Sequence, residues 1–132
     1  MRALGYHISF ESDMVAGQAI FVPADTPPDQ LSGQHYFVET GYEGVEHYCL
    51  WTNQDRPTPM ISQLPQCGDY ELIATVQMVT PLTDATNRVV VDVVIGDLAF
   101  AFTTNEIGRD VPRVNDVIAC TVRVLSLWDE AL

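Results

Sequence analysis

The stretch Arg88-Val-Val-Val-Asp-Val-Val-Ile-Gly-Asp-Leu-Ala-Phe-Ala-Phe-Thr103 decides the fold. Its two apolar runs are separated only by Gly96-Asp97, and a two-residue link that contains glycine is typical of a tight β-hairpin. The register is well specified, because a slip of one residue would turn Asp92 into the core. The predicted pairs are Ile95 with Leu98, Val93 with Phe100 and Val91 with Phe102 on one face, and Val94 with Ala99, Asp92 with Ala101 and Val90 with Thr103 on the other.

Strand-like runs flank this hairpin on both sides. Residues 70–80 place Leu72, Ala74, Val76 and Met78 on one face, and residues 114–128 predict one long strand. The apolar face of that long strand comprises Ile118, Cys120, Val122 and Val124. The order strand, link, tight hairpin, link, long strand over residues 70–128 is similar to a small Greek-key barrel of the OB type. The resemblance rests on strand spacing, so it implies an architecture and no particular family.

The N-terminal half predicts shorter strands within residues 4–10, 18–22, 34–40 and 45–52. The link Gly41-Tyr-Glu-Gly44 resembles a hairpin connection between the last two, and residues 27–31 could form one helical turn. The proline-containing connector 53–68 is a natural seam. We therefore expect a single domain over 1–132, mainly β, with little helix. It would hold a small antiparallel sheet or barrel, OB-like in the C-terminal half, and an N-terminal β-hairpin extension.

The charge balance restricts the classes of partner. The chain of 132 residues has 18 Asp and Glu against 6 Lys and Arg, a net charge of −12, and all six basic residues are arginine. Hydrophobic residues make up 47%, which is enough for a core and argues against wholesale disorder. Nucleic acids and anionic membranes are bound by clusters of Lys and Arg, and these are absent. We expect neither as a direct partner.

The sequence predicts a cytoplasmic protein. The first residues lack the apolar run of a signal peptide, and no stretch approaches the length of a membrane helix. Three cysteines, Cys49, Cys67 and Cys120, are too few and too scattered for a disulfide framework. Cys120 lies in an apolar run and is interpreted as a small buried hydrophobe.

No motif points to catalysis. His47 and Cys49 are two apart, so a regular strand would place them on one face, and His35, Glu39 and Cys67 are the further candidate ligands. Zinc needs three or four converging ligands, and a nucleophilic Cys–His pair needs an oxyanion site. Neither pattern is present, nor are a Gly-x-Ser-x-Gly elbow, a calcium loop or a phosphate loop. We expect no catalytic residues, no metal and no cofactor, and an enzyme centred on His47 and Cys49 ranks last.

Aromatic side chains are concentrated in the first half, with five between Tyr36 and Trp51. They predict either a binding surface or, as we prefer, the half-buried face of ordinary strands. Carboxylates surround them and should repel a nucleic-acid backbone. The residues proposed for partner binding are Glu39, Tyr42, Glu43, Glu46, Tyr48, Trp51 and Asp55.

These patterns favour a small acidic protein that binds a basic protein surface. An inhibitor or antagonist is the leading hypothesis, such as a toxin-neutralising immunity protein or a phage anti-defence protein. The alternative is a non-catalytic OB-like binding or assembly module whose edge strands add to a partner or to a second copy as a homodimer. The acidity could also serve solubility alone.

Overall fold

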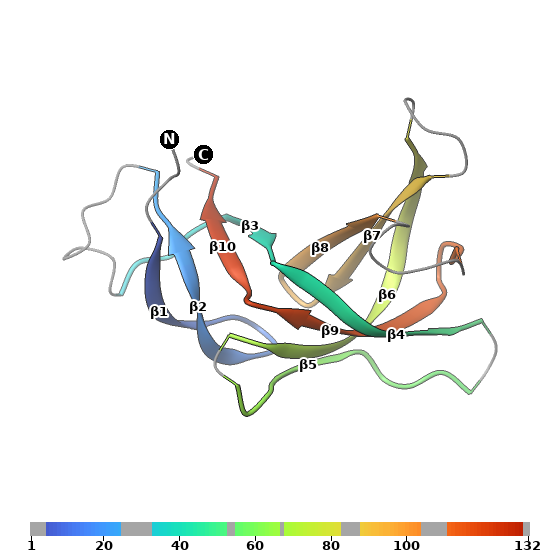
Figure 1. The fold of residues 1–132 in the computed structure, drawn as a ribbon, viewed down its shortest axis with the longest axis horizontal. Helices are drawn as coiled ribbons and strands as arrows, with labels where there is room; N and C mark the ends of the chain where they lie inside the picture. The colour runs from blue at the N-terminus through green and yellow to red at the C-terminus, as the bar shows by residue number, and fades with distance from the viewer. Residues whose placement is uncertain are drawn as a thin grey trace.

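The computed structural model describes residues 5–24, 33–52, 55–66, 68–82, 88–103 and 111–130. These residues form ten β-strands and no helix (Figure 1), which confirms the mainly β class. The OB-like Greek-key arrangement and the single-domain organisation stay predictions, and the expected helical turn at 27–31 lies outside the described residues. The strands are β1 (Tyr6–Glu11), β2 (Ala16–Val22), β3 (Val38–Gly41), β4 (Gly44–Trp51), β5 (Met60–Gln63), β6 (Tyr70–Pro81), β7 (Val89–Ile95), β8 (Leu98–Thr103), β9 (Val117–Arg123) and β10 (Ser126–Asp129).

The strands form two sheets, which lie on opposite sides of Figure 1. The four-stranded sheet has the order β1-β2-β10-β3, and the six-stranded sheet has the order β4-β9-β6-β7-β8, with β5 paired to β6. All pairs are antiparallel except β2 with β10, which is parallel. Both sheets contribute to one hydrophobic core, in which Phe21 and Leu127 from the first meet Leu72 and Phe102 from the second.

The hairpin of β7 and β8 has the predicted register in all six pairs. Gly96 provides a positive φ of 61° at the turn, a value that glycine adopts without steric cost. Val91, Val93, Phe100 and Phe102 are buried, as the alternation predicts. The prediction succeeds because a two-residue link leaves only one pairing that keeps Asp92 out of the core.

Strand β6 departs from its predicted face at Met78. The register against β7 shifts between Val76 and Met78, which inserts an extra residue and reverses the alternation beyond it. Leu72, Ala74 and Val76 are fully buried, but Met78 is 57% exposed. The prediction that Met78 shares their face is wrong because of this bulge.

The long strand predicted for residues 114–128 is instead two strands in different sheets. The break is at Val124, which has a positive φ of 56°, unusual for a β-branched residue. Beyond it the inward positions are Leu125 and Leu127, and Val124 itself is only partly buried. A bent strand that passes from one sheet to the other is a common way to make a corner between packed sheets.

The expected hairpin across Gly41 and Gly44 is not formed. β3 pairs with β10 and β4 pairs with β9, and residues 38–41 against 126–129 have the same register as residues 44–46 against 121–123. Between these two ladders, the backbone N–H of Glu43 donates to the carbonyl of Arg123 at 2.9 Å. Neither glycine has the positive φ that a tight turn would require. The N-terminal hairpin that does exist joins β1 and β2.

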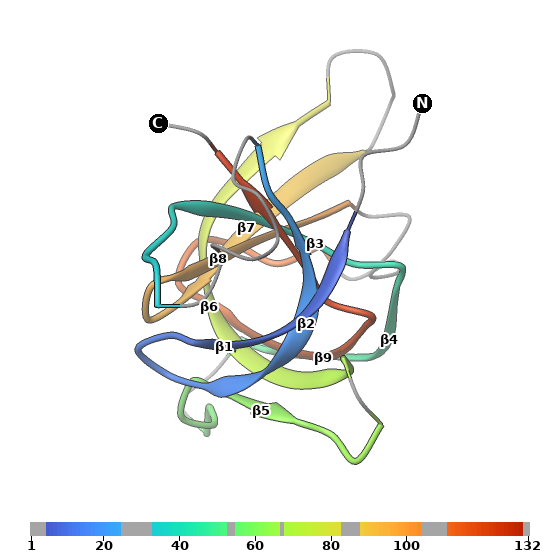
Figure 2. The ribbon, with the colours of Figure 1, turned by 90° about the vertical axis from the view of Figure 1, so that its left-hand side faces the viewer.

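The six-stranded sheet curves strongly (Figure 2). Side chains from the first half of the sequence contact its edge at β8. The Thr40 hydroxyl donates to the carbonyl of Ala99 at 2.6 Å, and the Tyr42 hydroxyl donates to that of Ala101 at 2.9 Å. Both acceptors belong to β8, whose other edge pairs with β7. Residues from the N-terminal half therefore cover an edge that the C-terminal half leaves open.

Candidate functional site

The outward face of the four-stranded sheet carries exposed aromatic side chains. Alternation along β10 turns Leu127 inward and Trp128 outward, and Trp128 remains 44% exposed. Just before β3, Phe37 is 73% exposed, whereas Val38 packs against the core. Exposed apolar side chains on neighbouring chain segments are a feature of interaction surfaces when they lie together.

Each of these two aromatics has a carboxylate opposite it on the neighbouring chain segment. Glu39 lies opposite Trp128 in the ladder between β3 and β10. The backbone N–H of Glu130 donates to the carbonyl of Phe37 at 2.9 Å, which extends the same register by one pair. Phe37 and Trp128 are therefore diagonal neighbours, as are Glu39 and Glu130, and diagonal positions are within reach of long side chains. We call these four residues the aromatic–acidic face.

The position of the Trp128 indole is fixed by its neighbours. Its Nε1 donates to the Ser126 hydroxyl at 3.1 Å. A Cβ atom added at Gly41 would lie 2.6 Å from the Ser126 Oγ and 3.1 Å from the Trp128 Nε1, so only glycine leaves this space. On its other side Trp128 lies beside Val22 of β2. The ring thus has a defined place on the sheet while nearly half of its surface faces solvent.

No arginine lies on this sheet. The strands β1, β2, β3 and β10 contain Glu11, Glu39 and Asp129 but no basic residue other than His7. Among the described residues, Glu39 and Glu130 form no ion pair. Their negative charge is therefore not offset within the described part of the sheet.

The outward face of the six-stranded sheet differs, because a cation lies within it. Arg123 Nη1 is 3.1 Å from Glu46 Oε1, and Arg123 Nε is 3.5 Å from Asp69 Oδ2. Asp69 is only 5% exposed, and its Oδ1 also accepts a hydrogen bond from the Val124 N–H at 3.0 Å. Part of the acidic charge on this side is structural, since it holds the corner between the sheets.

The residues predicted for partner binding do not all lie on one of these two sheet faces. Tyr42 and Tyr48 pack against the core, which matches the interpretation of a half-buried strand face. Trp51 is partly buried at the end of β4. The aromatic members of the predicted set therefore do not form one outward surface.

The acidic members of the predicted set are all exposed but lie apart. Glu39 is on the aromatic–acidic face, and Glu43 is at the corner between the sheets. Glu46 is on the six-stranded sheet in contact with Arg123, and Asp55 is beyond the end of β4. Their closeness in sequence does not bring them together, because β3 and β4 belong to different sheets.

His47 and Cys49 do not show the geometry of a metal site or a catalytic dyad. The β4–β9 register shifts between Glu46 and Cys49, and His47 has a positive φ of 57°, so the simple same-face argument fails there. Among the described residues, no three His, Cys, Asp or Glu side chains converge. Cys67 lies outside the described residues. Burial raises the pKa of Cys120 to about 12, so this thiol stays protonated at neutral pH.

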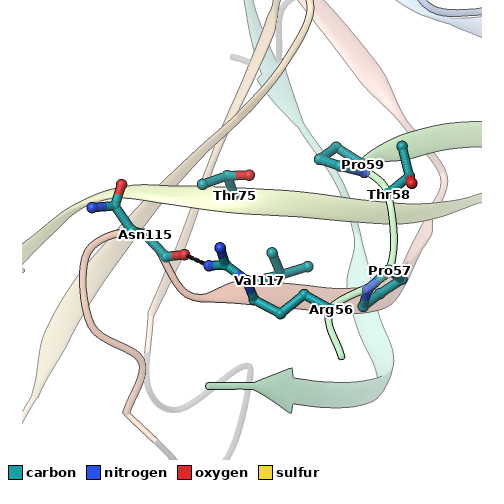
Figure 3. A pocket seen from close by; sticks show the side chains of 7 residues that line it. All are labelled: Arg56, Pro57, Thr58, Pro59, Thr75, Asn115 and Val117. Atoms are coloured by element: carbon teal, nitrogen blue, oxygen red, sulfur yellow. Dashed lines mark hydrogen bonds between the residues drawn. The ribbon is translucent and has the colours of Figure 1, made fainter. Parts of the chain in front are cut away.

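A hollow lies on the six-stranded sheet. The segment 55–59 passes over β6 and β9 (Figure 3), which explains why Val117 is buried on the outward side of its strand. The Arg56 guanidinium donates a hydrogen bond to the backbone carbonyl of Asn115. The seven lining residues include no carboxylate, histidine or cysteine: Arg56, Pro57, Thr58, Pro59, Thr75, Asn115 and Val117.

Sequence reasoning missed Trp128, Glu130 and the special position of Phe37. Phe37 belongs to the aromatic-rich stretch 36–51, whose local pattern does not distinguish it from the aromatics that pack against the core. The signal that could have found them is the match of two alternating pairs, Phe37 with Glu39 and Trp128 with Glu130. It becomes readable only when residues about ninety apart in the chain are known to be neighbours.

Comparison with known proteins gives no relative: no family model, no curated protein and no solved structure matches the chain. Within the described ranges, no helix has the length and hydrophobicity needed to cross a bilayer.

Proposed function

We propose that this chain is a small acidic protein that binds a basic surface of another protein and thereby blocks it. The observation that carries the proposal is the uneven distribution of charge. The described arginines, Arg56, Arg88, Arg113 and Arg123, all lie on or next to strands of the six-stranded sheet. Within the described part of the chain, the four-stranded sheet presents carboxylates and exposed aromatics, and its strands contain no arginine or lysine.

A basic target suits such a surface for two reasons. Complementary potentials accelerate encounter and reject acidic competitors. Apolar aromatic area supplies the desolvated contacts that hold a complex together after encounter. Proteins that bind nucleic acid have basic surfaces, which would be complementary to this acidic one. A nuclease toxin or a nucleic-acid-binding defence protein is therefore the class of target that we propose, with this chain as its inhibitor.

The test is capture of a partner followed by measurement with the purified pair. The tagged protein is incubated at low salt with an extract of its source cells, and captured proteins are identified by mass. The affinity of the purified pair should fall at least about tenfold between about 50 mM and about 500 mM NaCl. An affinity independent of salt, or a partner without a basic surface, would refute the proposal.

Charge reversal tests the same proposal through residues. Glu39→Lys and Glu130→Lys together should weaken binding, chiefly through a slower association rate, because both carboxylates lie at the four-stranded sheet. The control is Glu71→Lys, which reverses an exposed carboxylate on the six-stranded sheet. If the double variant binds as the unaltered protein does, these two carboxylates do not contribute to binding.

An assembly module remains the second candidate, favoured by one observation. Among the described strands, β1 pairs only with β2, so its other edge is open to a further strand. A homodimer built on this edge would double the mass measured by light scattering. A monomer at high protein concentration would exclude it.

A further inference from the structure

We infer that the aromatic–acidic face is a binding site for arginine side chains of a partner protein. The inference rests on the proposed function and deepens it, because it names both the surface and the chemical group recognised. The face consists of Phe37, Glu39, Trp128 and Glu130, two aromatics and two carboxylates on adjacent chain segments.

The arrangement of the four side chains matches the chemistry of a guanidinium group. A guanidinium stacks on an aromatic ring through its flat face and donates paired hydrogen bonds to a carboxylate through its edge. On this face each aromatic has a carboxylate directly opposite it: Trp128 faces Glu39, and Phe37 faces Glu130. Two arginines of one partner could therefore each meet a ring and a carboxylate.

The exposure of the face supports an external ligand. Phe37 is 73% exposed and Trp128 is 44% exposed, yet both belong to segments tied down by backbone hydrogen bonds. Trp128 is further held by its bond to Ser126 and by the close approach of Gly41. A ring held in place and left open loses little conformational freedom when it binds, which favours affinity.

The charge of the surroundings selects the occupant. An apolar partner would have to bury Glu39 and Glu130 without counter-ions, which is costly. An acidic partner or a nucleic-acid backbone would be repelled. A lysine could satisfy the carboxylates but stacks less well on the rings and donates no fork of parallel hydrogen bonds. Arginine alone uses both components of the face.

The experiment compares an oligo-arginine peptide with an oligo-lysine peptide, each of about nine residues, by titration calorimetry against the full chain. We expect the arginine peptide to bind about two- to fivefold tighter at equal salt. Phe37→Ala and Trp128→Leu should each remove most of that preference, and Glu39→Gln with Glu130→Gln should weaken both peptides. Phe37→Ala alters a largely exposed side chain, so it keeps the test independent of any folding defect at Trp128.

The control variants lie on the other sheet. Met60→Ala and Glu71→Gln alter an exposed apolar and an exposed acidic side chain and should leave both affinities unchanged. Equal binding of the two peptides, or an unchanged preference in Phe37→Ala and Trp128→Leu, would overturn the inference. If the unaltered chain binds neither peptide and captures no basic protein, the proposed function fails as well. If it captures a basic protein that none of the face variants weakens, the function stands and only this site is wrong.

Discussion

The carboxylate of Asp69 accepts a hydrogen bond from the backbone N–H of Val124, with 3.0 Å between Oδ1 and N. This contact lies where the chain leaves the six-stranded sheet and enters the four-stranded sheet. The carbonyl of the preceding Gly68 accepts from the N–H of Leu125 at 2.8 Å. The two bonds satisfy the backbone donors that a strand gives up when it bends away from its ladder.

Replacement of Asp69 by alanine should destabilise the fold. Asp69 is buried, and its loss leaves the Val124 N–H without a partner, which costs about 1–3 kcal/mol of unfolding free energy. Urea denaturation measures the loss, with the exposed neighbour Glu71→Ala as control. Equal midpoints for the two variants would mean that Asp69 does not hold the corner.

The positive φ of Val124 predicts an unusual tolerance for glycine. Val124→Gly removes the strain of a β-branched residue at φ 56°, so the free energy of unfolding should change by less than about 1 kcal/mol. Val122→Gly, two residues earlier and within β9, removes a fully buried side chain and should cost about 2 kcal/mol or more. Comparable losses at both positions would contradict a left-handed conformation at Val124.

How far the sequence predicts this fold depends on where strand partners lie in the chain. The β7–β8 hairpin follows from residues 88–103 alone, because its partners are adjacent and one acidic residue fixes the register. The pairing of 38–46 with 121–129 has no local signal, and two glycines between aromatic runs wrongly predicted a hairpin there. The same long-range pairing creates the aromatic–acidic face. For that reason the sequence identified Glu39 but not its neighbour Trp128.

The hydroxyl of Tyr42 should stabilise the contact between the end of β3 and the edge of β8. Tyr42→Phe removes the hydrogen bond to the Ala101 carbonyl and should lower the unfolding free energy by about 0.5–1.5 kcal/mol. Hydrogen exchange should quicken along β3 and β8 and remain unchanged in the β1–β2 hairpin. Unchanged exchange along β8 would show that the Thr40 contact is sufficient by itself.

The described cysteines should differ in reactivity. Cys49 is exposed, whereas Cys120 is buried. In a Cys67→Ser variant, iodoacetamide should therefore modify one thiol rapidly and the second only after unfolding, as counted by intact mass. Rapid modification of both thiols in the folded protein would show that the core around Cys120 opens readily.

The buried thiol also predicts a dependence of stability on pH. Burial raises the pKa of Cys120 from 9.0 to about 12, so the folded state holds this proton more tightly than the unfolded state. The resulting stabilisation is fully present below pH 9 and is lost as the pH rises toward 12. Cys120→Ala should therefore show a shallower loss of stability over this range in urea denaturation. Parallel pH profiles for the two proteins would disprove the linkage.

Binding of arginine at the four-stranded sheet can be located directly by a nuclear magnetic resonance titration of the isotope-labelled chain with the oligo-arginine peptide. We predict that the largest amide shifts fall on residues 37–41 and 126–130 and on the adjacent positions of β2. They should shrink as salt is raised, because the contacts are partly ionic. Shifts centred on Glu46, Glu71 and Ala119 of the six-stranded sheet, or no shifts at all, would contradict this site.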